Sequence, residues 1–95
     1  MKKITLDLTR CETLYEVHSR IQKAFDFPDW YGKNLDAFYD LLRTECDADE
    51  VLIIGTKDLS NELKEELNSL CFILEKKAEF NKNLGFNEFK YEIKD

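Results

Sequence analysis

The sequence has few of the residues that build catalytic and metal sites in small proteins. Its 95 residues include one histidine, one tryptophan, one proline and three glycines. The three cysteines, Cys11, Cys46 and Cys71, are widely spaced and form no CxxC pair, so nothing supports a zinc site. A GxGxxG run and a phosphate-binding P-loop are also missing. We therefore expect reduced thiols and no bound metal or cofactor.

Long apolar runs are missing as well. The first ten residues, MKKITLDLTR, contain lysines, but polar residues interrupt every apolar run, unlike in a secretory signal. No stretch approaches the roughly 18 consecutive apolar residues of a membrane-spanning helix. We expect a cytoplasmic protein that does not contact a membrane.

The composition is that of a globular protein. Hydrophobic residues make up 43% of the chain and aromatic residues 13%, which is enough to form a core. The length suits one domain and is too short for two. We expect residues 1–95 to form a single domain.

The negative charge is concentrated between residues 26 and 50. This segment holds eight acidic residues and only two basic ones, Lys33 and Arg43, which gives the whole net charge of −6. The other seventy residues carry twelve charges of each sign. An acidic surface repels nucleic acid and attracts basic protein surfaces. We expect a protein partner and no nucleic acid.

Three segments have the hydrophobic pattern of β-strands. Residues 3–8 and 89–93 alternate apolar with polar side chains, as half-buried strands do. Residues 51–55, VLIIG, are instead continuously apolar before the glycine. Such a run predicts a strand that is buried on both faces, in the middle of a sheet.

Helical patterns separate these strands. Thr13 followed by Glu16 predicts a capping box at the start of one helix, and Asn34 is a suitable N-cap for a second helix that ends near Thr44. A leucine stripe within residues 57–81 predicts either one long helix or two shorter ones. Strands connected by helices form parallel sheets. We expect an α/β fold with a three-stranded parallel sheet in the order 1-2-3 and about four helices.

Residues 28–42, PDWYGKNLDAFYDLL, combine a loop of aromatic residues with an acidic helix. Asp36 and Asp40 lie four residues apart, where like charges in a helix cost about 0.2–0.5 kcal/mol. In one interpretation these residues are purely structural. Asp36 then stabilises the N-terminus of the helix through the helix dipole, Asp40 pairs with Arg43, and the aromatic rings are half-buried. That interpretation does not explain why the excess charge gathers at this helix. The alternative is that the carboxylates are kept for a cationic partner.

The same segment resembles the signature of the barstar family, whose founding member is the intracellular inhibitor of the secreted ribonuclease barnase. The resemblance is sharp only in residues 28–42 and extends more loosely over essentially the whole chain. Its most specific motif is Tyr31-Gly32 followed by Asn34-Leu35-Asp36-Ala37. It implies the barstar fold, which agrees with the element order above. It also implies a one-to-one complex with a basic, extracellular-type ribonuclease.

The resemblance further implies which residues bind the ribonuclease. Asp40 would take the place of an RNA phosphate in the cationic active site, and Asp36 would add a second carboxylate. Trp30 would cover the catalytic histidine of the enzyme. The complete set of implied partner-binding residues is Trp30, Tyr31, Gly32, Asn34, Asp36, Tyr39, Asp40 and Glu75.

Two other classes of function are enzymatic activity and protein interaction without inhibition. His18 has no suitable nucleophile beside it, and an Asp36–Asp40 acid–base pair would lack a substrate-binding architecture in so short a chain. We therefore expect no enzymatic activity. A non-inhibitory acidic module for protein interaction or regulation, with the same fold, is the alternative. Lys33 is a departure from the known inhibitor, which has an acid there, and leaves the target nuclease open.

Overall fold

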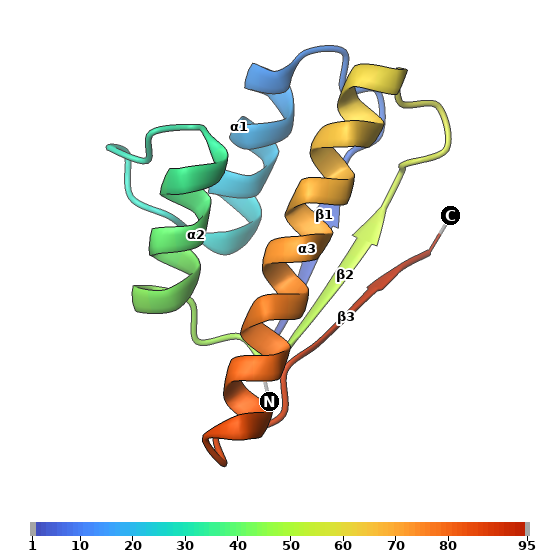
Figure 1. The fold of residues 1–95 in the computed structure, drawn as a ribbon. Coiled ribbons are helices and arrows are strands. Elements are labelled where there is room, and N and C mark those ends of the chain that lie inside the picture. Colours follow the sequence, from blue (N-terminus) through green and yellow to red (C-terminus); the bar gives the residue numbers. More distant parts are fainter. Residues whose placement is uncertain (1, 95) are drawn as a thin grey trace.

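The computed structural model describes residues 2–94, so the two ends of the expected domain, Met1 and Asp95, lie outside the described residues. The elements follow one another as β1 (Lys3–Asp7), α1 (Leu14–Phe25), α2 (Leu35–Thr44), β2 (Glu50–Ile54), α3 (Asn61–Asn83) and β3 (Lys90–Ile93) (Figure 1). The strands form one parallel sheet in the order β1-β2-β3. The predicted fold class, sheet order and strand direction are confirmed.

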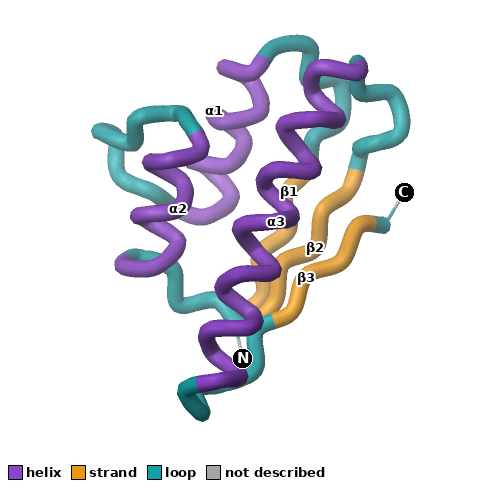
Figure 2. Tube along the Cα trace, viewed as in Figure 1, coloured by secondary structure: helices purple, strands orange, loops and turns teal. Residues whose placement is uncertain are grey.

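The sheet is buried on one face only, which corrects the prediction for β2. Val51 and Ile53 are buried, whereas the alternate residues Leu52 and Ile54 are only partly covered. The helices lie together on one side of the three strands (Figure 2). No helix of residues 2–94 covers the other face, so the continuous apolar run marks a central strand with one half-open face.

Helix α3 is a single helix of 23 residues, so the expected number of about four helices is wrong. Residues 2–94 contain three α-helices. Leu63, Leu67, Leu70 and Leu74 are all buried, so the apolar stripe continues through Asn68 without interruption. No glycine or proline lies within the helix to break it.

Helix α2 forms the outer edge of the helical layer. It packs against α3, and its Phe38 meets Phe25 of α1 edge to face, with ring centroids 5.5 Å apart. Leu41 and Leu42 are buried with Phe38. The opposite side of α2 consequently faces solvent, which is the side that carries the two aspartates.

Three further observations concern the cysteines, membrane-spanning helices and metal ligands. All three cysteines are free thiols, and Cys11 is the buried one. No helix within residues 2–94 combines the length and the apolar character needed to cross a membrane. In the same part of the chain, no three histidine, cysteine or acidic side chains gather in an arrangement that could hold a metal ion.

Candidate protein-binding surface

The loop that enters α2 is tied to α1 by one glutamine. The side-chain amide of Gln22 donates a hydrogen bond to the carbonyl oxygen of Pro28 at 2.9 Å, and its oxygen accepts one from Lys33 Nζ at 2.8 Å. Both ends of the loop are thus held against the same helix. Nothing in the sequence pattern singled out Gln22, because its partners lie in an irregular segment.

Lys33 is directed away from the aspartates of α2. Besides its bond to Gln22, its ammonium group lies 5.5 Å from the centre of the Tyr15 ring on α1. Its backbone has a φ of 52°, a left-handed conformation that few residues other than glycine adopt. Lys33 therefore serves the loop structure, and it forms no ion pair with either Asp36 or Asp40.

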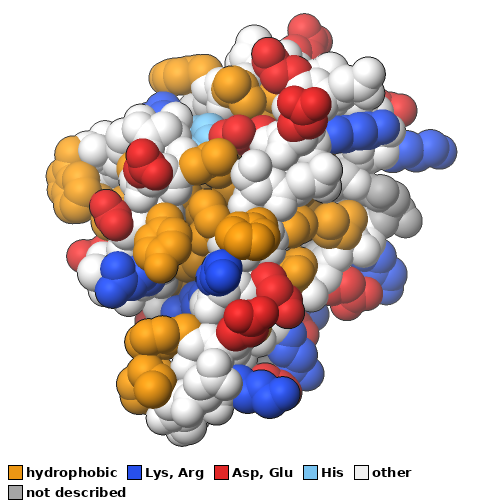
Figure 3. Space-filling view, in the orientation of Figure 1, with side chains coloured by type: hydrophobic (Ala, Val, Ile, Leu, Met, Phe, Trp, Pro, Cys, Tyr) orange, Lys and Arg blue, Asp and Glu red, His pale blue; other side chains and the backbone are white. Residues whose placement is uncertain are grey.

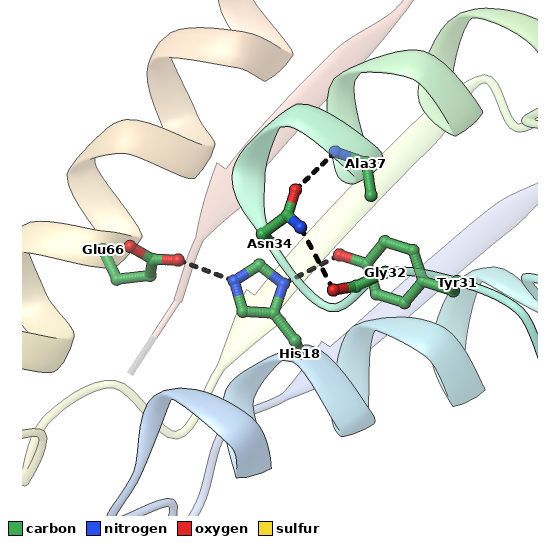
Figure 4. A network of polar contacts seen from close by, with 6 residues as sticks. All are labelled: His18, Tyr31, Gly32, Asn34, Ala37 and Glu66. Atoms are coloured by element: carbon green, nitrogen blue, oxygen red, sulfur yellow. Dashed lines mark hydrogen bonds and ion pairs between the residues drawn. The ribbon is translucent and has the colours of Figure 1, made fainter.

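A buried polar network supports the same loop from below (Figure 4). His18 of α1 is 1% exposed, and its Nδ1 lies 2.7 Å from the hydroxyl of Tyr31. Its Nε2 lies 2.6 Å from a carboxylate oxygen of Glu66 on α3. Because an ionised carboxylate only accepts hydrogen bonds, Nε2 donates to Glu66, and in the neutral ring Nδ1 accepts from Tyr31. The network joins two helices and the loop, so His18 has a structural role.

The structure places Tyr31 in the core, which argues against its expected contact with a partner. Its side chain is 3% exposed, and its ring packs against Phe27. Burial, together with the negative charge of Glu66, raises the pKa of the Tyr31 hydroxyl well above its usual value. Tyr31 holds the loop in place and offers no surface to another protein.

Trp30 has the opposite environment, although it is the next residue along the chain. It is 73% exposed and belongs to no aromatic pair of the described core. The backbone N–H of Tyr31 bonds to the carbonyl of Pro28 at 2.9 Å, so the loop turns tightly here. A large indole is thus presented to solvent from an anchored backbone.

Asn34 and Gly32 set the start of α2. The Asn34 side-chain oxygen accepts a hydrogen bond from the N–H of Ala37 at 2.8 Å, which confirms the predicted N-cap. Its amide nitrogen donates to the carbonyl of Gly32 at 3.1 Å (Figure 4). A Cβ at Gly32 would lie 3.3 Å from both Ala37 Cβ and Asn34 Nδ2. Gly32 therefore permits close packing, whereas the left-handed backbone conformation of the loop is adopted by Lys33.

The carboxylates of Asp36 and Asp40 have no partner within the described chain. Both residues are exposed, and neither side chain forms a hydrogen bond or an ion pair with any of residues 2–94. Tyr39 lies between them in the sequence and is 41% exposed. The pairing of Asp40 with Arg43 is not observed, because the Arg43 guanidinium lies 5.5 Å from the Tyr39 ring centre instead. We call Trp30, Asp36, Tyr39 and Asp40 the α2 face.

Glu75 does not join the α2 face. It interacts with the hydroxyl of Tyr91 on β3, and burial together with this carboxylate raises the pKa of Tyr91. The next residue, Lys76, instead lines the groove between α3 and α2. The expected contribution of Glu75 to the same surface as Asp40 is therefore not supported by its position.

Three of the four acids of residues 45–50, Asp47, Asp49 and Glu50, are engaged in structural contacts. Lys2 Nζ lies 2.8 Å from Asp47, and the backbone N–H of Lys2 donates to Asp49 at 3.0 Å. Glu50 lies 3.3 Å from Lys3 Nζ. These contacts join β1 to the connection before β2. Only part of the excess negative charge is consequently available to a partner.

Comparisons with known proteins agree with this architecture. A family model described as "Barstar (barnase inhibitor)" matches residues 1–93. A Bacillus subtilis (strain 168) protein named "Putative ribonuclease inhibitor YrdF" is 36% identical over 61 residues. That alignment covers 64% of this chain and 67% of the relative.

Proposed function

The chain belongs to the barstar family, and on that premise we propose that it inhibits a basic, barnase-like ribonuclease. In this proposal the α2 face enters the active site of the enzyme and forms a one-to-one complex. Asp40 takes the position of an RNA phosphate, and Asp36 adds a second negative charge. The chain itself catalyses no reaction.

The observation that carries the proposal is that the side chains of Asp36 and Asp40 have no partner among residues 2–94. A ribonuclease active site is cationic because it must hold a phosphate. A carboxylate that enters it gains charge-assisted hydrogen bonds, which are about twice as strong as neutral ones. Since neither aspartate has to leave an internal ion pair, none of this gain is lost in breaking contacts of the free inhibitor.

Trp30 supports the proposal through its exposure and its anchored backbone. Tryptophan is enriched among the residues that contribute most to protein–protein affinity. Its loop is held by Gln22 and Tyr31, so little conformational entropy is lost when the loop binds. We expect the indole to pack on the rim of the active site, beside the two carboxylates.

The overall charge favours rapid association with a basic enzyme. The chain carries a net charge of −6, and all of it belongs to residues 26–50. Opposite fields of this kind steer two proteins together and raise the association rate, an effect that salt weakens. The paired acids of residues 45–50 still contribute to this field, although they are not free to make contacts.

A ribonuclease titration tests the proposed function. Increasing amounts of the protein are added to a fixed amount of barnase, and to other basic ribonucleases of the same class, with an unrelated acidic ribonuclease as the control enzyme. We expect activity to fall linearly to a one-to-one endpoint for at least one basic enzyme and to remain constant for the control. If every barnase-like enzyme stays fully active at micromolar inhibitor, the chain is a non-inhibitory interaction module of the same fold.

A further inference from the structure

A groove of about 400 Å³ runs between α2 and α3, next to the α2 face. Its apolar wall consists of Tyr39, Leu42, Ile73, Phe80 and Phe86. Phe80 and Phe86 are 52% and 59% exposed, and their ring centroids lie 5.9 Å apart. Contiguous exposed aromatic side chains of this kind mark interaction sites more often than isolated ones do.

The polar lining of the groove is cationic. Arg43, Lys76 and Lys77 all line it, and no aspartate or glutamate among residues 2–94 does so. This is a local exception in a chain with twenty acidic and fourteen basic residues. Figure 3 shows basic side chains beside the hydrophobic side chains along the seam between α2 and α3.

The cations of the groove are not neutralised from within the fold. Neither Arg43 nor Lys76 forms an ion pair with a carboxylate in the described part of the chain. They lie beside aromatic rings instead, Arg43 at 5.5 Å from the Tyr39 centre and Lys76 at 5.1 Å from the Phe72 centre. Each therefore retains hydrogen-bond donors for a carboxylate from another molecule.

From these contacts we infer that the groove binds an acidic segment of the protein partner. An apolar or aromatic side chain of that segment fills the space between Ile73 and Phe80, and flanking carboxylates meet Arg43 and Lys76. The inference rests on the proposed function in one respect. Tyr39 belongs to both surfaces, so the acidic segment lies on the same ribonuclease, next to its cationic active site.

Acidic residues of this chain at one end of the groove indicate how the acidic segment of the partner is oriented. A neighbouring hollow, behind Lys77 and Phe86, is lined by Asp47 and Asp49. A bound carboxylate would be repelled at that end. The acidic residues of the partner therefore lie toward Arg43 and Lys76, at the end of the groove that adjoins the α2 face.

Peptide binding tests the groove without any ribonuclease. The probe is a short peptide with one phenylalanine flanked by glutamates, and the control peptides replace every glutamate by glutamine or by lysine. Amide shifts are followed by NMR in the wild-type protein, in the double variant Arg43→Glu/Lys76→Glu and in the matched surface variant Asp36→Asn. We expect shifts around Ile73 and Phe80 with the acidic peptide only, a loss of affinity of about tenfold or more in the double variant, and no loss in Asp36→Asn.

Three outcomes would overturn the inference. The acidic peptide produces no shifts in the groove, or the glutamine peptide binds equally well, or the shifts depend on protein concentration alone because a second copy of the chain occupies the groove. Each of these results stands whether or not the protein inhibits a ribonuclease.

A second experiment compares the inhibition constants of the wild-type protein and the double variant Arg43→Glu/Lys76→Glu against any ribonuclease that the wild-type protein inhibits. Reversing two cations makes the inhibitor more acidic, so general electrostatic attraction to a basic enzyme predicts tighter binding. The groove contact predicts the opposite, a rise of about tenfold or more in the inhibition constant. An unchanged or lower constant overturns the inference and leaves the proposed inhibition intact.

Discussion

The two acidic stretches of residues 26–50 differ in what their carboxylates contact. Around the connection to β2, Asp47 and Asp49 bind Lys2, and Glu50 meets Lys3. On α2, the carboxylates of Asp36 and Asp40 bind nothing in the described chain. Both stretches contribute to the negative field. In the first stretch, three carboxylates are already engaged in contacts, whereas both carboxylates of α2 are free to coordinate the cations of another protein.

This difference shows that the charge of a segment locates a binding surface only approximately. The sum over residues 26–50 is −6 and treats all eight acids alike. Three of them join the start of the chain and β1 to the segment before β2, whereas Asp36 and Asp40 lie on one helix without a side-chain partner among residues 2–94. Substitutions in the two groups should therefore have different consequences.

The largest effect is expected from Asp40→Ala. Removal of one member of a desolvated ion pair costs about 2–5 kcal/mol of binding free energy, or roughly thirtyfold to a few thousandfold in the inhibition constant. The melting temperature should not fall, because the Asp40 carboxylate has no partner among the described residues. Enzyme inhibition and thermal unfolding measure the two quantities.

Asp47→Ala is the matched control for this comparison. It removes an acid from the other stretch and breaks the contact with Lys2, so we expect a small decrease in melting temperature and a nearly unchanged inhibition constant. Equal losses of inhibition in the two variants would mean that only the net charge matters. Unfolding of Asp40→Ala would instead make that residue structural.

Trp30→Ala should have the next largest effect. Truncation of an interface tryptophan costs about 2–4 kcal/mol of binding free energy. Because Trp30 lies largely in solvent, the melting temperature should stay constant. The neighbouring change Tyr31→Phe should behave in the reverse way, with lower stability and little direct loss of contact. A Trp30→Ala protein that inhibits as well as wild type would remove the entry loop from the interface.

His18→Phe tests whether the buried network holds the binding loop. The ring volume is kept, but Glu66 and Tyr31 lose their partner, which costs about 1–3 kcal/mol of unfolding free energy. We also expect weaker inhibition, since the loop that presents Trp30 is no longer fixed. Denaturant unfolding and inhibition are compared with Lys64→Ala on the exposed side of α3. Unchanged values for His18→Phe in both assays would contradict a supporting role for the network.

The smallest effect concerns alkaline pH. The folded pKa of Tyr31 is raised, mainly by burial and also by Glu66, above the unfolded value of about 10. The contribution of the neutral hydroxyl to stability is therefore complete below about pH 10 and decreases as the pH rises beyond it. In Tyr31→Phe the free energy of unfolding should decrease less above about pH 10 than in the wild-type protein. Tyr15→Phe, which changes an exposed ring, should leave this decrease unchanged. If the free energy of unfolding depends on alkaline pH in the same way in the wild-type protein and both variants, Tyr31 does not cause the loss of stability.

Signals that act between near neighbours in the sequence were sufficient to predict much of the fold. Thr13 and Asn34 cap their helices as expected, since a cap involves residues only three positions apart. The half-open face of the sheet could also have been derived. Right-handed crossovers in the order 1-2-3 place every helix on the same side, which leaves β2 covered on one face.

The details of the binding surface depend on contacts between distant segments and could not be predicted in this way. Trp30 and Tyr31 are adjacent aromatic residues, and Tyr31 is the buried one because it contacts Phe27 and His18 of α1. Glu75 is one position from Lys76, and the rotation of α3 against α2 and β3 decides which of the two faces the groove. Such differences arise from packing, which periodicity does not determine.

Competition with a nucleotide tests most directly whether Asp36 and Asp40 take the place of a phosphate. The inhibition constant of the wild-type protein is measured at increasing concentrations of a mononucleotide that occupies the active site of the inhibited ribonuclease. If the inhibitor and the nucleotide compete for the same site, the apparent inhibition constant rises in proportion to the nucleotide concentration. A constant that is independent of the nucleotide would show that the two bind at different places and would contradict the proposed mechanism.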